Sequence, residues 1–103
     1  MLDKDNEAGL KEKHELTMRM WDVIDLFEAD KGADAIKAID SIIEELKLSG
    51  GALQEVLFFK SRLEFASQGK DAALKSLNAA LEADPESRMA GEIKQVIDMN
   101  FKN

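Results

Sequence analysis

The sequence has no cysteine, a single histidine and a single proline among its 103 residues. Without cysteine the chain forms no disulfides and no thiolate metal sites, so packing alone must stabilise the fold. Long apolar runs are also missing: the longest run of large apolar residues, Val56–Phe59, is far shorter than the ~20 residues that span a membrane. The N-terminus lacks the basic and then apolar order of a secretory signal. We therefore expect a soluble, cytoplasmic protein.

Basic residues are few relative to acidic ones. The chain has 14 Lys and Arg against 21 Asp and Glu, which gives a formal net charge of −7. Nucleic acids and anionic membranes would repel such a chain, so neither is expected as a partner. A basic protein or peptide is compatible with this charge. The length and the 45% apolar content suit one domain.

Motifs for catalysis, metal binding and cofactor binding are absent from the sequence. The positions three and four residues from His14 hold no metal-ligand side chain. The segment that starts at Asp3 has the spacing of a calcium loop, but Ala8 replaces the required glycine and His14 the required glutamate. The Gly50-Gly51 pair lacks the lysine and hydroxyl residue of a phosphate loop. We expect a protein that is not an enzyme and that uses no cofactor or metal.

The composition and the apolar spacing favour an all-α fold. There are 13 Ala and 12 Leu but only three Val, one Thr and no Tyr, and Ala and Leu favour helices over strands. Apolar residues recur at helical spacing between breaks at the glycines and the proline. The predicted organisation is a polar N-terminus that frays (1–11), a first helical hairpin (12–48), a second hairpin (51–84) and a C-terminal capping helix (85–101).

Two aspartates and the proline are predicted to mark helix ends. Asp34 is expected to be the N-cap of the second helix. The fourth helix is expected to stop at Asp84, because a residue before proline avoids helical geometry. Asp84 is then expected to cap the fifth helix, with Pro85 in its favoured first position.

Parts of the chain resemble each other. Residues 35–44 align with 73–82 at a shift of 38, so that apolar, small and charged positions coincide. A shift of 37 pairs Trp21 with Phe58 and Gly32 with Gly69. Two copies of a helix-turn-helix unit followed by one closing helix are typical of a helical solenoid.

The second copy resembles the tetratricopeptide repeat. That family spaces a small residue, a large apolar residue, a small residue and a proline as Ala73, Leu77, Ala80 and Pro85 are spaced, and often has glycine where Gly69 stands. The resemblance implies a short α-solenoid of two tetratricopeptide-like hairpins and a capping helix. It also implies a non-enzymatic scaffold or adaptor that binds a peptide or helix in its concave face.

The resemblance implies that five residues contact a ligand on that face. Trp21, Asp22, Phe59 and, as a further candidate, Phe58 would line it, and Arg62 would fix a polar or acidic group. Neighbouring residues on a helix point about 100° apart, so a core on one side buries only one of Phe58 and Phe59 fully. Either flanking helices bury both rings, or one ring lines a groove or a dimer contact.

Two further functional alternatives remain open. Asp22, Asp25 and Glu28, spaced by three, form either a solvated face or an acidic wall that steers a basic segment. Two repeats are fewer than the three or so that usually stabilise a solenoid. A homodimer, or an accessory subunit of a larger assembly, is therefore an alternative to the peptide-binding module.

Overall fold

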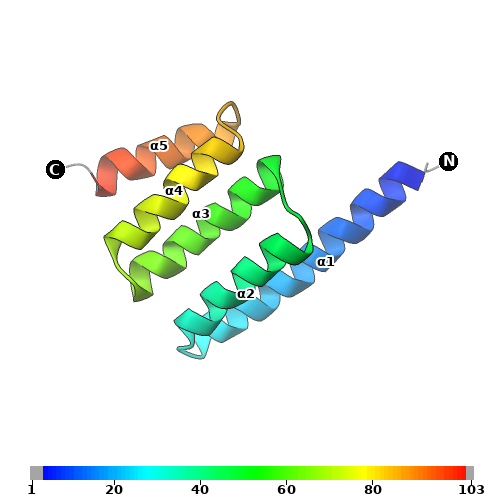
Figure 1. Cartoon of the computed structure of the whole chain (residues 1–103), viewed down its shortest axis with the longest axis horizontal. Helices are drawn as coiled ribbons and strands as arrows, with labels where there is room; N and C mark the ends of the chain where they lie inside the picture. The colour runs from blue at the N-terminus through cyan, green and yellow to red at the C-terminus, as the bar shows by residue number, and fades with distance from the viewer. Residues whose placement is uncertain (1–3, 102–103) are drawn as a thin grey trace. The chain divides into compact units, whose positions relative to one another are not determined.

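The computed structural model describes residues 4–101 of the chain, with side chains from residue 14 onward. These residues form five α-helices and no strand, which confirms the predicted all-α fold (Figure 1). The helices are α1 (Lys4–Glu28), α2 (Gly32–Glu45), α3 (Gly50–Ser67), α4 (Lys70–Ala83) and α5 (Arg88–Asn100). The chain divides into two compact units, unit 1 (Met1–Lys47) and unit 2 (Leu48–Asn103).

The first helix begins earlier than predicted. Residues 4–11, expected to precede the helix as a frayed segment, belong to α1, whereas residues 1–3 lie outside the described residues. Five of its eight residues have high helix propensity: Lys4, Glu7, Ala8, Leu10 and Lys11. Extending an existing helix by such residues costs little, because nucleation is the unfavourable step. The predicted start at residue 12 followed the first apolar residues of the stripe, which begin later than the helix does.

Unit 1 is a hairpin of α1 and α2. After α1, Asp30 adopts a left-handed φ of 65°, and the Lys31 N–H donates to the Leu26 carbonyl at 2.9 Å. Aspartate thus takes the C-cap conformation in which glycine is most common. Between the two helices, Arg19 on α1 forms an ion pair with Glu45 on α2.

The start of α2 differs from the prediction. Lys31, not Asp34, is the N-cap residue, and no side chain caps this helix. Asp34 lies instead in the first turn. A carboxylate there is stabilised by the partial positive charge of the helix N-terminus, so the helix can begin without a capping hydroxyl or carboxylate.

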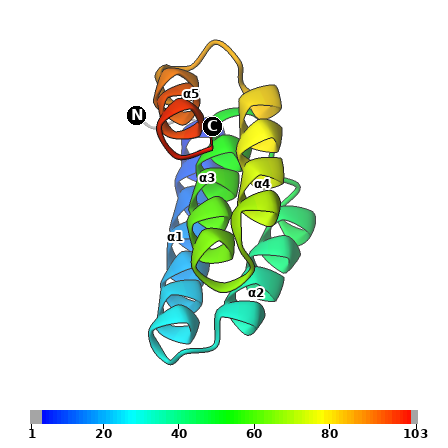
Figure 2. The ribbon, with the colours of Figure 1, turned by 90° about the vertical axis from the view of Figure 1, so that its left-hand side faces the viewer.

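Unit 2 consists of an antiparallel α3–α4 hairpin with α5 packed against it (Figures 1 and 2). The turn between α3 and α4 contains Gly69, whose φ of 101° is open to glycine and unfavourable for other residues. Leu77, Ala80 and Ile93 form the buried centre of the unit. Further apolar side chains that are partly buried pack around them: Leu57, Phe58, Leu81, Met89, Val96, Ile97 and Phe101.

The fourth helix ends as predicted, but the fifth begins later. Asp84 is the C-cap residue of α4, which confirms the predicted end. The prediction that Asp84 caps α5 with Pro85 at the first helical position is wrong, because α5 starts at Arg88 after the N-cap Ser87. The Ser87 Oγ accepts a hydrogen bond from the Ala90 N–H at 3.0 Å and so satisfies one free donor of the helix.

A buried glutamine accounts for this later start. Gln54 on α3 is 1% exposed, and its Nε2 donates to the carbonyls of Ala80 at 2.9 Å and Asp84 at 2.8 Å. Its Oε1 accepts a hydrogen bond from the Ser87 Oγ. Gln54 therefore fixes the end of α4 and the cap of α5 together. The chain turns between these two contacts and becomes helical only after Ser87.

Substituting leucine for Ala80 is expected to lower the free energy of unfolding by about 1–3 kcal/mol, the usual cost of overpacking a core. Ala80 is 0% exposed and lies in the cluster with Leu77 and Ile93, so the added atoms have no free space to enter. Urea unfolding followed by circular dichroism measures the change. Ala33, which is exposed at the start of α2, gives a matched control: Ala33→Leu should be nearly neutral. An unchanged Ala80→Leu midpoint would contradict close packing at this position.

Candidate functional site

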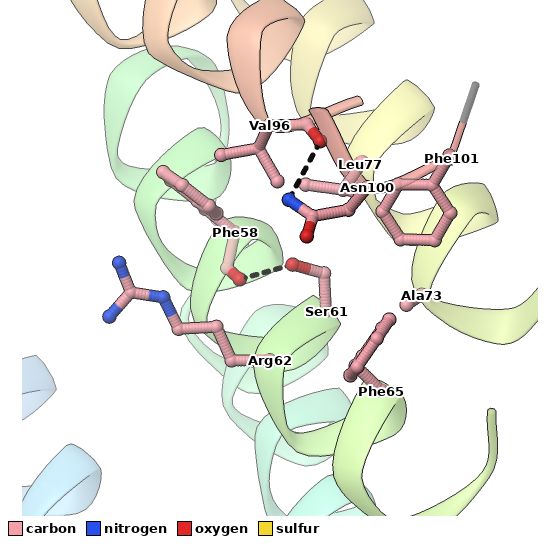
Figure 3. A pocket seen from close by; sticks show the side chains of 9 residues that line it. All are labelled: Phe58, Ser61, Arg62, Phe65, Ala73, Leu77, Val96, Asn100 and Phe101. Carbon is pink, nitrogen blue, oxygen red and sulfur yellow. Dashed lines mark hydrogen bonds between the residues drawn. The ribbon is translucent and has the colours of Figure 1, made fainter. Parts of the chain in front are cut away.

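A cavity of about 250 Å³ lies within unit 2 between α3, α4 and the end of α5 (Figure 3). Helix α3 contributes the most lining residues, α4 contributes apolar residues, and α5 with the residue after it closes the remaining side. The lining residues are Phe58, Ser61, Arg62, Phe65, Ala73, Leu77, Val96, Asn100 and Phe101. We call this cavity the aromatic pocket.

Two phenylalanines from distant parts of unit 2 meet at the aromatic pocket. The ring of Phe65 meets the ring of Phe101 edge to face, with centroids 5.9 Å apart and an interplanar angle of 86°. This is one of the two favoured geometries for aromatic pairs. Phe101 follows the last turn of α5, where its N–H donates to the Ile97 carbonyl at 2.9 Å. Phe65 is nevertheless 47% exposed, so an apolar surface remains open to a ligand.

The guanidinium of Arg62 lies beside this apolar surface. The guanidinium carbon of Arg62 lies 5.0 Å from the centroid of the Phe58 ring, a cation–π arrangement. Arg62 is exposed, so its guanidinium can be reached by a ligand. The ring holds the guanidinium in place while its N–H groups stay available. The aromatic pocket therefore combines an apolar floor with a positioned donor for an anion.

The other polar groups of the aromatic pocket are engaged locally. The Ser61 Oγ donates to the Phe58 carbonyl one turn earlier, and the Asn100 Nδ2 donates to the Val96 carbonyl at 3.0 Å (Figure 3). The Asn100 side chain points into the pocket among the labelled residues. These bonds leave Arg62 as the charged group that lines the cavity.

Of the five residues predicted to bind a partner, two line the aromatic pocket. Phe58 and Arg62 lie one helical turn apart on α3 and face the same cavity. Phe59 is half-buried and does not line it. Trp21 and Asp22 are exposed on α1, in unit 1. Phe58 both packs against the core of unit 2 and lines the pocket, so the two alternatives for the pair stay open.

Sequence reasoning missed Phe65 and Phe101 as site residues. Phe101 continues the helical apolar spacing of Met89, Ile93 and Ile97, and that spacing was the signal available. The meeting of the two rings depends on how α5 packs against α3, which local spacing does not determine.

A second, polar hollow lies on unit 2. Small and apolar residues line part of it. The charged residues that line it are Lys60, Glu64, Asp71 and Lys75. Glu64 is 7% exposed and accepts a hydrogen bond from the Ser76 Oγ. The opposite charges largely offset one another here, so this hollow selects a ligand less sharply than the aromatic pocket does.

Within residues 14–101, no group of three or more His, Asp or Glu side chains is placed to hold a metal ion. Across the described helices, none combines the length and apolar character required to cross a membrane. Comparison of the chain with protein-family models, with curated proteins and with solved structures found no match. The resemblance to the tetratricopeptide repeat therefore stays a prediction from the residues quoted above.

Proposed function

We propose that the protein is a non-enzymatic interaction module that binds a protein segment through the aromatic pocket. The segment presents a bulky apolar side chain next to a carboxylate. The observation that carries this proposal is the Arg62 guanidinium, held over Phe58 at the edge of a cavity that is otherwise mainly apolar.

The size of the pocket favours a side chain over a cofactor or metabolite. Pockets for small molecules usually have volumes of about 300–1,000 Å³, whereas this one is about 250 Å³. One large side chain suits such a volume. Aromatic and arginine residues are also the commonest energetic centres of protein interfaces, and the pocket contains both types.

The positive charge of Arg62 determines which group of the ligand should lie beside its apolar side chain. A guanidinium binds a carboxylate with two parallel hydrogen bonds, which gives both energy and orientation. The chain as a whole carries a net charge of −7 and would repel a strongly acidic tail. The proposed ligand therefore carries a carboxylate beside its apolar side chain and is not a run of acidic residues.

The resemblance to the tetratricopeptide repeat supports the same location. It implies ligand binding along the first helix of each hairpin, and α3, which carries Phe58 and Arg62, is the first helix of the second hairpin. We accordingly propose a short tetratricopeptide-like solenoid in which α5 acts as the closing helix.

Two short peptides that differ only in an aspartate or an asparagine beside a tryptophan test this proposal. We expect the aspartate peptide to bind more tightly, and Arg62→Gln to weaken it about tenfold, or about 1.4 kcal/mol, because a charge-assisted pair is lost. The asparagine peptide should bind the wild-type protein and the Arg62→Gln variant with the same affinity. Fluorescence polarisation of labelled peptides measures these affinities.

Arg88→Gln is the matched control, because Arg88 is exposed at the start of α5 and does not line the pocket. It should leave both affinities unchanged. Equal weakening by Arg62→Gln and Arg88→Gln would indicate general electrostatic attraction and would contradict a specific site.

A further inference from the structure

We infer that the aromatic pocket binds a second copy of this chain, through Trp21 and Asp25 on α1 of that copy. This inference rests on the proposed function, since it names a partner for the same pocket. The chain itself carries the chemistry that the pocket selects: a bulky apolar side chain with a carboxylate on the same helix face.

Trp21 is the exposed aromatic group of this pair. It is 59% exposed, and Met18, three residues earlier on the same face of α1, is 55% exposed. Trp21 is also the only tryptophan in the sequence. Solvent-exposed tryptophan is unfavourable in a monomer and is enriched at the centres of protein interfaces.

Asp25 supplies the carboxylate. It lies four residues after Trp21, so the two side chains are neighbours on the helix surface, whereas adjacent residues such as Asp22 point elsewhere. Asp25 is exposed. The arginine nearest to it on α1, Arg19, is engaged with Glu45. Asp25 thus places a negative charge beside Trp21, and the exposed Arg62 of a second copy is complementary to it.

The aromatic pocket and the face of α1 that carries Trp21 are different surfaces, so the contact between two copies is not symmetric by itself. If each copy places its Trp21 in the pocket of the other, the contact closes as a dimer; otherwise copies add in a row. One aromatic side chain buries about 150–250 Å², and stable interfaces bury about 1,200–2,000 Å² in total. Reciprocal exchange doubles the contact, so a dimer with a weak, concentration-dependent equilibrium is expected.

Sedimentation velocity of the full chain, from about 10 µM to about 1 mM, tests this inference in the range of weak complexes. The wild-type protein should shift toward dimer as concentration rises, and the Trp21 emission should shift to shorter wavelength in parallel. Trp21→Ala, Asp25→Arg and Arg62→Asp should each raise the dissociation constant at least tenfold. Glu44→Arg makes the same charge change as Asp25→Arg at an exposed position on α2. It should change the dissociation constant by about twofold or less.

A mixture of two variants tests directly whether the two positions contact each other in different copies. Asp25→Arg and Arg62→Asp exchange the signs of the two proposed partners, so an equimolar mixture should associate although neither variant associates alone. This result requires contact between the two positions in different copies and does not follow from a general change in stability or charge.

A wild-type protein that stays monomeric over the whole range would overturn the inference, and so would a mixture that fails to associate. In either case the peptide experiment with Arg62→Gln still decides the proposed function. Peptide binding that depends on Arg62, without self-association, would leave the pocket a binding site for other proteins. Absence of both self-association and Arg62-dependent peptide binding would contradict the proposed function as well.

Discussion

Replacing Gln54 with alanine is expected to lower the free energy of unfolding by about 3 kcal/mol. Gln54 makes three hydrogen bonds that tie α3 to the end of α4 and the start of α5. A buried hydrogen bond contributes about 1 kcal/mol net, and a buried carbonyl left without its donor costs at least as much. Because Gln54 is 1% exposed, water cannot easily replace the lost amide.

Urea unfolding followed by circular dichroism measures this loss. Gln68→Ala is the control, because Gln68 is exposed at the end of α3 and the substitution removes the same side chain. It should change stability by less than about 0.5 kcal/mol. A double-mutant cycle with Ser87→Ala should show coupling between the two positions, since Ser87 donates to Gln54. Independent effects would contradict the shared network.

Truncating Leu77 to alanine is expected to lower the free energy of unfolding by about 2–5 kcal/mol, the range for leucine in a packed core. Leu77 is 1% exposed, belongs to the central cluster of unit 2 and also lines the aromatic pocket. The substitution removes apolar contacts and enlarges a cavity that already exists. The surrounding helices cannot close that space without moving.

Two further variants separate packing from other causes in this experiment. Leu77→Met keeps most of the volume and should cost less than about 1.5 kcal/mol. Leu74→Ala removes a half-buried leucine from the same helix and should cost clearly less than Leu77→Ala. Amide hydrogen exchange in unit 2 reports the loss locally. Equal losses at Leu74 and Leu77 would contradict the tighter packing of Leu77 in the core.

The helices were predictable because their causes lie close together in the sequence. Apolar spacing of three and four residues marks α2 to α5, and the effect of Pro85 on the preceding residue placed the end of α4 correctly. The same local reasoning failed at the start of α5. The cap there depends on a hydrogen bond between Ser87 and Gln54, which are 33 residues apart.

The candidate site was predictable in part for the same reason. Phe58 and Arg62 are four residues apart, so their shared helix face follows from helical geometry alone. The contact between Phe65 and Phe101 requires α5 to pack beside α3, which is a tertiary arrangement. Pocket lining was not predictable locally either: Phe58 and Phe59 look alike in the sequence, yet only Phe58 lines the pocket.

The central claim, that the aromatic pocket of unit 2 binds a protein segment, is tested most directly by nuclear magnetic resonance. The isotope-labelled chain is titrated with the tryptophan–aspartate peptide, and backbone amide shifts are followed. The account predicts that the largest shifts occur at Phe58, Arg62, Phe65 and Phe101, which line the cavity. Shifts concentrated at Lys60 and Lys75 in the polar hollow, or no shifts with the peptide in large excess, would contradict it.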